Sequence, residues 1–203
     1  MLRESLSAAF LDLGPRAPTI LPGWEAAQLL SHLLLRERYP HLQIGRMLPS
    51  GLGRGAAAAV EQLEASPWQE QVELLRNGPP RLSPVAAVDR LSNDSELLIH
   101  REDLLRAQPD REPQPAPAEL QAQAWQAVGP MARVAMRVRA DVILVSPLGG
   151  RRLPSRRGDA SVRVHGEPIE LLLWVSGRDR AARVRVHGDQ AGLTALREGR
   201  RGL

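Results

Sequence analysis

The sequence predicts a mainly α-helical protein that ends in a small α+β part. Up to about residue 138, apolar residues recur at the spacing of three and four that is typical of amphipathic helices. After Arg139, short runs alternate between apolar and polar residues, which is the pattern of half-buried strands. A chain of 203 residues, 43% of them hydrophobic, can bury an ample core in one large domain or two small ones. We therefore expect two domains, residues 1–138 and residues 139–203.

Proline and glycine divide the helical part. Gly14-Pro15 and Tyr39-Pro40 end two amphipathic segments, and the glycine-rich residues 45–55 are expected to form a loop. Ser66-Pro67-Trp68 is typical of an N-cap followed by Pro at the first helical position. Gly129-Pro130 is expected to disturb the last of these helices. The helices predicted from the periodicity span about residues 2–13, 24–38, 56–65, 67–77, 86–107 and 117–137.

The C-terminal part combines strands with two short helices. Turns are expected at Gly149-Gly150, Gly158-Asp159 and His187-Gly188-Asp189. Residues 168–176 are apolar and of helical length, and Gly177 fits the position that follows a helix C-terminus. The remaining predicted elements are strands over residues 142–145, 161–164 and 182–186 and a last helix over residues 190–197.

The composition excludes several kinds of chemistry. Cysteine is absent, so the chain has no disulfide, no thiolate metal site and no cysteine nucleophile. The net charge is +4 and the pI is 10.9, but every basic residue is Arg, whose very high pKa accounts for part of this pI. Arg clusters at residues 151–157 and 197–201 could contact phosphates. Basic strands interleaved with aromatic residues are absent, however, so nucleic-acid binding is a minor hypothesis.

The sequence contains no apolar run long enough to cross a bilayer. Its first residues, Met1-Leu2-Arg3-Glu4-Ser5, lead into an amphipathic segment rather than into the apolar core and cleavage site of a signal peptide. We therefore expect a cytoplasmic protein without a membrane partner.

The predicted helix over residues 86–107 carries a candidate metal site. Glu96 and His100 are four residues apart, so both side chains project from one face and can bind the same divalent metal. Further polar residues lie on that face, bordered by apolar residues on both sides, namely Asp89, Asn93 and Asp103. Such a band suits a polar cavity within a helical bundle, and a solvated helix face is the alternative.

Several motifs along the chain resemble those of one protein family. Leu21-Pro22-Gly23-Trp24 leads into Leu30-Ser31-His32-Leu33, and Glu96-x-x-x-His100-x-Glu102-Asp103 follows later. Together they resemble the DinB-like metal-binding helical bundles, and more narrowly the mycothiol-dependent maleylpyruvate isomerase type. A subgroup described only as metal-binding proteins shares residues 77–81 and 170–178. The resemblance covers nearly the whole chain and implies a DinB-like four-helix-type bundle followed by a small domain similar to sterol carrier proteins.

The resemblance also implies a set of site residues. By position, His32, Glu96 and His100 would bind a divalent metal, usually zinc, although nickel and iron accept the same ligands. In the family an Arg of the C-terminal domain, which covers the metal cavity, helps to position the substrate. Arg178 is the candidate here, and an ordinary charged turn residue is the alternative. Many relatives have a second His directly after the ligand His, where this chain has Arg101, a cation that would change the charge beside the site.

Asp103 lies on the same helix face as His100, and two interpretations of it stay open. Its carboxylate could accept a hydrogen bond from the imidazole and so orient a metal ligand. Alternatively, it could form an ion pair with Arg106 or Arg101 on the helix surface.

Two His and one Glu form the ligand set of catalytic zinc sites, which keep coordination positions open for water or substrate. Because the chain lacks cysteine, a thiol bound there would be an external low-molecular-weight thiol, mycothiol in the family, activated as its thiolate. The resemblance implies an isomerase or thiol transferase that acts on a small electrophilic or acidic molecule. The sequence leaves the choice between a monomer and a homodimer open. The alternative is a non-catalytic metal-binding protein of the same fold.

Overall fold

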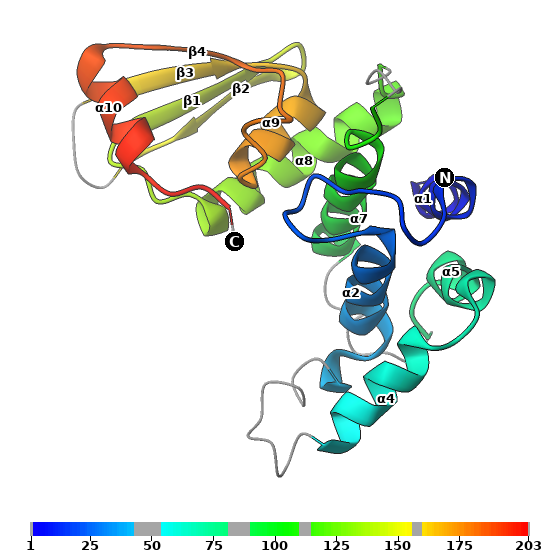
Figure 1. The fold of residues 1–203 in the computed structure, drawn as a ribbon. Coiled ribbons are helices and arrows are strands. Elements are labelled where there is room, and N and C mark those ends of the chain that lie inside the picture. Colours follow the sequence, from blue (N-terminus) through cyan, green and yellow to red (C-terminus); the bar gives the residue numbers. More distant parts are fainter. Residues whose placement is uncertain (1, 43–53, 81–89, 110–114, 156–159, 203) are drawn as a thin grey trace. The chain divides into compact units, whose positions relative to one another are not determined.

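The computed structural model describes residues 2–42, 54–80, 90–109, 115–155 and 160–202 (Figure 1). The chain forms two compact units, Met1–Pro113 and Gln114–Leu203. The first unit is helical and the second combines helices with a small sheet, so the mainly α fold with a small α+β part is confirmed.

The first unit packs its helices around a leucine-rich core. α2 contacts α4, α5 and α7, and α1 contacts α5 and α7. α2 is apolar over most of its circumference, which is why it lies among the others with so many leucines buried. Its helices are α1 (Leu2–Leu13), α2 (Ala26–Arg38), α4 (Arg54–Glu64), α5 (Trp68–Asn77) and α7 (Arg90–Leu105). Fully buried side chains include Leu6, Phe10, Leu29, Leu30, Leu33, Leu34, Leu75, Leu97, Leu98 and Leu104.

The segment between α1 and α2 fixes the start of α2 against the end of α7. The backbone N–H of Ile20 donates to the carbonyl of Asp103 at 2.9 Å. The Thr19 hydroxyl donates to the carbonyl of Trp24 at 2.8 Å, which closes a turn immediately before the helix. At the first turn of α2, the Gln28 side chain accepts the backbone N–H of Glu25 at 2.9 Å. The connector thereby sets the position of α2 relative to α7.

The second unit is a four-stranded sheet with helices. The strand order is β2-β1-β3-β4; β1 pairs parallel with β3, and the two edge strands pair antiparallel with their neighbours. Alternate residues of β1 and β3 are buried, and α9, which is apolar apart from Glu170, packs against α8. Its elements are α8 (Ala118–Ala135), β1 (Asp141–Ser146), β2 (Gly149–Leu153), β3 (Ser161–His165), α9 (Pro168–Val175), β4 (Arg185–Gly188) and α10 (Gln190–Glu198).

The division between the units lies between Pro113 and Gln114, whereas the change in sequence pattern placed it between residues 138 and 139. The difference is due to α8. This helix has the amphipathic pattern of the preceding helices, but its buried face packs against α9 and also contacts β2. Periodicity shows that a helix buries one face and does not show which neighbour covers it.

Three details of the C-terminal part differ from the sequence-based prediction. Gly149-Gly150, predicted as a turn, begins β2, and the turn lies at Pro147-Leu148. The last strand begins at Arg185 rather than at residue 182. His187 and Gly188, also predicted as a turn, end that strand; Asp189 then caps α10 by accepting the N–H of Gly192 at 2.6 Å.

Two details of the helices also differ. α8 includes Pro130, so the proline expected to disturb this helix does not end it. α5 begins at Trp68 with Pro67 as its N-cap, while the hydroxyl of Ser66 donates to the carbonyl of Gln62. Of the loop predicted over residues 45–55, residues 54 and 55 instead begin α4, and the rest lies outside the described residues. The start of the long helix at residues 86–89 and the turn at Gly158-Asp159 also lie outside them.

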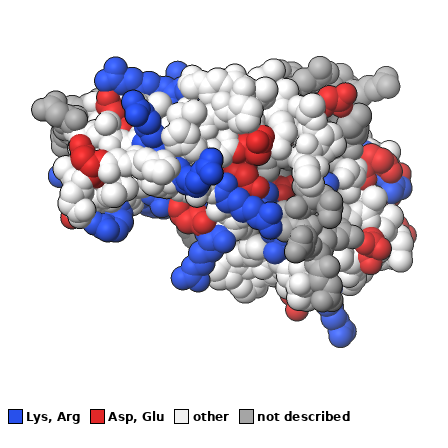
Figure 2. Space-filling model, turned by 90° about the horizontal axis from the view of Figure 1, so that it is seen from above, with Lys and Arg blue, Asp and Glu red and all other residues white. Residues whose placement is uncertain are grey.

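Charge is unevenly divided between the two units. Residues 114–203 contain fifteen Arg against eight Asp and Glu, whereas residues 1–113 contain twelve Arg against fifteen Asp and Glu. On the face shown in Figure 2, the described basic side chains lie in small groups among acidic and uncharged ones. None of the described helices is both long enough and apolar enough to span a membrane.

Candidate metal centre

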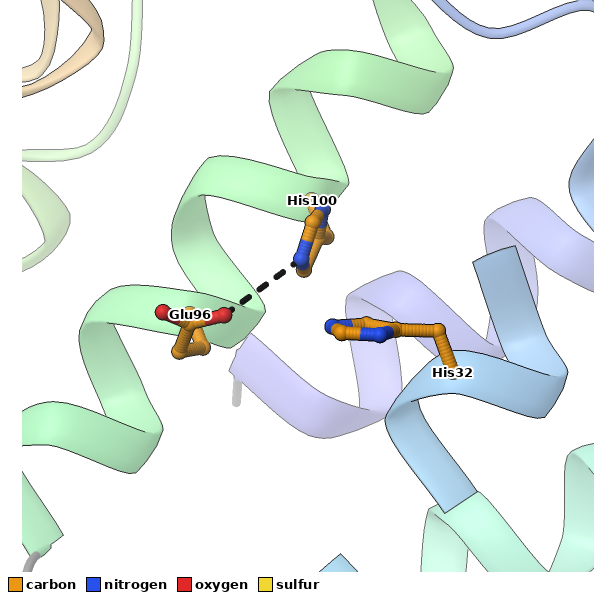
Figure 3. A group of neighbouring side chains, drawn as sticks. All are labelled: His32, Glu96 and His100. Atoms are coloured by element: carbon orange, nitrogen blue, oxygen red, sulfur yellow. Dashed lines mark ion pairs between the residues drawn. The ribbon is translucent and has the colours of Figure 1, made fainter. Parts of the chain in front are cut away.

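Three side chains of the first unit converge where α2 faces α7. His32 projects from α2, and Glu96 and His100 project from successive turns of α7 (Figure 3). One potential ligand atom from each of the three residues lies within 4.8 Å of those of the other two. The carboxylate Oε2 of Glu96 is 3.4 Å from Nε2 of His100. The three residues that the family resemblance implied are therefore brought together and could hold a metal ion.

The local sequence explains why these side chains face one another. On α2, Leu29 and Leu33 flank His32 and are fully buried, so the helix is anchored immediately around the histidine. On α7, Leu97 and Leu104 are buried in the same way. The four-residue spacing of Glu96 and His100 places both on one face of α7, as the sequence indicated. This is the face that is turned toward His32 of α2.

Asp103 orients His100. Its Oδ2 lies 2.8 Å from Nδ1 of the imidazole, and its side chain is fully buried. With Nδ1 donating to this carboxylate, Nε2 is the nitrogen directed toward Glu96, and loss of its proton would make its lone pair available to a cation. The competing ion-pair partners of Asp103 considered from the sequence, Arg101 and Arg106, both bond to Glu102. The described contact of Asp103 is thus the one with the imidazole, and its role in supporting a metal ligand stays a prediction.

Aromatic contacts define another side of the cluster. The indole of Trp24 packs edge-to-face on the ring of His32, with 5.5 Å between centroids, and the His32 ring contacts the His100 ring at 5.1 Å. Trp24 directly precedes the capping residue Glu25 of α2, so the connector that fixes the helix also places an apolar ring against a candidate ligand. Such a contact restricts the rotation of His32.

The ionisation of the cluster favours charged forms of Glu96 and His100 in the absence of a metal. Burial lowers the pKa of His100, but the hydrogen bonds to Asp103 and Glu96 outweigh it and leave the pKa raised. Burial likewise raises the pKa of Glu96, and the hydrogen bond to His100 together with the positive charge of Arg36 outweighs it and leaves the pKa lowered. Glu96 and His100 thus form an ion pair in the metal-free protein. A dication bound between them would take the place of the proton on Nε2 of His100.

The cation beside the cluster is not the one expected from the sequence. Arg101 donates to the hydroxyl of Ser5 at 3.1 Å and to the carboxylate of Glu102 at 2.7 Å. Instead, Nε of Arg36 lies 3.7 Å from Oε2 of Glu96. The sequence contained a signal for this contact, because Arg36 follows His32 by four residues and therefore shares its helix face.

Arg178, the candidate substrate-positioning residue, belongs to the second unit. It follows Gly177, whose φ of 85° is the left-handed conformation expected after a helix C-terminus. Nη1 of Arg178 donates to the carbonyl of Ser176 at 2.8 Å, and the side chain is half-buried. Its role toward a substrate stays a prediction.

The donor set fits a divalent metal. Two imidazoles and one carboxylate are ligands that zinc, nickel and iron accept, and three protein ligands leave coordination positions open. The buried Asp103 carboxylate on the far nitrogen of His100 is the supporting contact that metal-binding histidines usually have. A buried His–Glu pair with a purely structural role would require neither the nearby His32 nor the contact between Asp103 and His100.

Two solved structures have a similar fold over nearly the whole chain. One is the mycothiol-dependent maleylpyruvate isomerase, at 15% sequence identity and a TM-score of 0.53, and the other is a histidine-to-alanine mutant of such an isomerase, at 13% and 0.55. Each comparison covers 94% of this chain and 89% of the other. Comparisons with protein-family profiles and with curated protein sequences find no match. At these identities the similarity establishes a relationship of fold.

The fold and the site together define a class of protein. The chain is a helix-rich protein with a small four-stranded sheet and a His-Glu-His group that could hold a metal. Its fold is similar to that of an isomerase that depends on the thiol mycothiol.

Proposed function

We propose that this protein is a divalent-metal enzyme that uses an external thiol on a small electrophilic or acidic substrate, as an isomerase or a thiol transferase. The observation that carries the proposal is the convergence of His32, Glu96 and His100 within 4.8 Å, in a fold similar to that of the mycothiol-dependent isomerase. We propose zinc as the metal and mycothiol as the thiol. We propose a DinB-like bundle as the fold that carries the site, followed along the chain by the small C-terminal domain.

Each residue would have a distinct task. His32 and His100 would supply neutral imidazole nitrogens, and Glu96 would supply a carboxylate oxygen. Asp103 would hold the Nδ1 proton of His100 and keep Nε2 free to bind. Arg178 would bind a substrate carboxylate, for which a guanidinium offers two parallel hydrogen bonds.

The metal, when bound, lowers the pKa of a thiol that coordinates it and thus supplies a nucleophile at neutral pH. This chain has no cysteine to take that part, so the thiol must come from outside. Trp24 and the leucines around the cluster would exclude water from one side, which strengthens the electrostatic interactions there.

Metal analysis of variants tests the site. We expect the purified wild type, loaded with zinc and desalted, to retain one zinc per chain, and His32→Ala and His100→Ala to retain little. His41→Ala is the matched control, because His41 is an exposed histidine of the same unit whose ring contacts that of Tyr39. Unchanged zinc content in both site variants would show that the metal assignment is wrong.

A thiol-binding measurement separates the enzyme from a non-catalytic metal-binding protein of the same fold. We expect calorimetry to show mycothiol binding to the zinc-loaded protein and none to the metal-free protein. Activity on electrophilic alkenes should then require both zinc and thiol. Zinc retention without any thiol binding would favour the non-catalytic alternative.

A further inference from the structure

We propose that the second unit binds a small organic molecule through a phosphate group, on the exposed face of its sheet where β3 pairs with the edge strand β4 (Figure 1). Arg183, Arg185 and His165 would contact the phosphate. All three residues belong to Gln114–Leu203, whereas the candidate metal ligands belong to the first unit. The inference therefore goes beyond the proposed function and does not depend on it.

The two strands carry the same three residues, Arg-Val-His. Because the strands are antiparallel, their register pairs Arg163 with His187 and His165 with Arg185. The two valines pair with each other and point to the opposite side of the sheet, where Val164 is fully buried. Two arginines and two histidines thus share the face that is turned to solvent, and the two imidazole rings contact each other at 5.5 Å between centroids. We call this group the basic sheet face.

A hollow of about 710 Å³ adjoins the basic sheet face, at the carboxyl ends of β1 and β3. His165, Arg183 and Arg185 line it together. Pro147 and Val184 give it apolar surface as well. Small-molecule sites have volumes of this order and combine apolar walls with a few convergent polar groups. The hollow can therefore receive an organic group attached to an anion.

The positive charge of this region lacks a partner in the part of the chain that the structure describes. The exposed side chains of Arg163, Arg183 and Arg185 form no hydrogen bond or ion pair there. Glu167 is the acidic residue among those that line the hollow, so the region keeps a net positive charge even when its histidines are neutral. A phosphate monoester carries a charge of about −1.5 to −2 at pH 7 and compensates such a cluster better than a single carboxylate does.

The available donors also suit a phosphate. A guanidinium can donate two parallel hydrogen bonds to phosphate oxygens, and a neutral imidazole has one N–H to donate. Arg185 and His165 are direct cross-strand partners, and such partners have Cβ atoms about 4.5–5.5 Å apart. Arg183 lines the same hollow. Three donor groups are therefore within reach of the terminal oxygens of one phosphate.

The uncompensated charge is confined to β3, β4 and the residues just before β4, which favours a small ligand over a polymer. Arg152 of β2 lies on the same sheet face, because the register pairs it with Ile143 and pairs Ile143 with Arg163. The guanidinium of Arg152 is already bound, since its Nε donates to Asp141 at 2.9 Å. A long polyanion such as nucleic acid needs phosphate contacts along a continuous basic surface, and this face does not extend one across the sheet.

Calorimetric titration of the full-length protein with three probes tests the inference. Phenyl phosphate is the probe for the site. Phenyl sulfate has nearly the same shape but a single negative charge, and inorganic phosphate lacks the organic group. Each titration is carried out on zinc-loaded and on chelator-treated protein, because an anion that binds at the metal centre would require the metal.

We expect phenyl phosphate to bind at least tenfold more tightly than phenyl sulfate, equally with and without zinc. Arg183→Gln and Arg185→Gln should each lose about tenfold or more of the affinity for phenyl phosphate, in line with the loss of a charge-assisted hydrogen bond. Arg185→Lys should recover part of it, because the charge returns without the planar fork. Arg152→Gln is the matched control, since Arg152 is an exposed arginine of the same sheet face that pairs with Asp141, and it should behave as the wild type.

Proton NMR of the histidine rings shows where the probe binds. The chain has five histidines, and His165→Gln and His187→Gln assign the two signals of the basic sheet face. We expect phenyl phosphate to shift these two signals and to leave that of His41 unchanged.

Several results would overturn the inference. These are no binding of phenyl phosphate, equal affinity for phenyl sulfate, and wild-type affinity in both Arg183→Gln and Arg185→Gln. Binding that requires zinc would assign the phosphate to the metal centre instead. Inorganic phosphate that binds as tightly as phenyl phosphate would show that the hollow does not hold an organic group. A DNA duplex that displaces phenyl phosphate at physiological salt would make the face a nucleic-acid surface rather than a small-molecule site.

Discussion

Asp103 shows how one buried carboxylate can orient a candidate metal ligand. Its side chain is fully buried and its Oδ2 lies 2.8 Å from Nδ1 of His100. Burying a carboxylate without a partner is costly, so the contact with His100 compensates Asp103 as well as orienting the imidazole. The next residue along the chain provides a comparison, because Glu102 is also buried but pairs with Arg101 and Arg106. Two adjacent carboxylates thus serve different purposes.

Asp103→Asn should weaken zinc binding by about tenfold to hundredfold, because an amide holds the Nδ1 proton of His100 less well. Competition with a calibrated chelator measures the affinity. Glu102→Gln is the control variant, since it changes an adjacent buried carboxylate that bonds only to arginines among the contacts described for it. We expect its zinc affinity, per folded molecule, to stay within a few-fold of the wild type. Equal losses in both variants would indicate a general effect of the helix.

The pKa of His100, raised by Asp103 and Glu96, predicts how the stability of the metal-free protein depends on pH. A raised folded-state pKa contributes stability that is fully present below the ordinary value of 6.5 and is lost as the pH rises through the folded-state value. Urea unfolding of chelator-treated protein should therefore show a decline above pH 6.5 that His100→Gln lacks. His41→Gln should retain the decline. The lowered pKa of Glu96 affects stability at acidic pH: the stability that this carboxylate contributes is lost as the pH falls below 4.5.

At the scale of elements, a buried ion pair holds three helices of the first unit together. The two terminal nitrogens of Arg3 on α1, Nη1 and Nη2, donate hydrogen bonds to the carboxylate of Glu37 on α2, at 2.6 and 3.0 Å. The same guanidinium donates to the carbonyl of Leu75 on α5 at 2.9 Å. Glu37 is 1% exposed, so removal of Arg3 would leave a buried carboxylate without its partner. This link keeps α2, which bears His32 and Arg36, in place.

Arg3→Met should lower the free energy of unfolding by about 3–5 kcal/mol, the usual cost of breaking a buried ion pair from one side. The double variant Arg3→Met with Glu37→Leu should be clearly more stable than Arg3→Met alone, because the unpaired carboxylate is gone. Chemical denaturation of the metal-free proteins measures both. If the double variant were as unstable as the single one, the loss would come from packing rather than from the buried charge.

Long amphipathic helices were the elements that the sequence predicted best. The first helix was placed at residues 2–13, and α1 spans Leu2–Leu13. The strand pattern was less informative for the edge strand β2. This strand begins with Gly149-Gly150, and glycines have no side chain that could show an alternation of apolar and polar residues. The partner of α8 was not predictable either, since an apolar helix face packs equally well on another helix or on a sheet.

The site was predictable in part, and the limit has a physical reason. Helical spacing placed Glu96 and His100 on one face, and the family resemblance added His32 from a helix distant in sequence. Arg36 could have been noticed, because it follows His32 by four residues on the same helix face. The position of Arg101 was not predictable, because its guanidinium donates to Ser5 on α1, and no local pattern encodes a contact between helices so distant in sequence.

At the scale of the whole molecule, the candidate metal centre lies within one of two compact units. His32, Glu96 and His100 all belong to residues 1–113, and each unit has its own buried core. The units differ in charge as well, because the second carries an excess of Arg and the first an excess of carboxylates. A ligand that binds only the folded first unit should stabilise that unit directly.

Zinc should therefore slow amide hydrogen exchange selectively. At a free zinc concentration of about 100 times the dissociation constant, the stabilisation is about 2.7 kcal/mol, which slows exchange through global opening of the unit roughly hundredfold. We expect this protection in α2 and α7, and changes of no more than a few-fold in β1, β3 and α9. The measurement is mass spectrometry of peptic fragments with and without zinc, with His100→Ala as the control in which neither unit should respond. Equal protection of α9 in the wild type would show instead that the two units open together, and metal binding in one would then govern the stability of both.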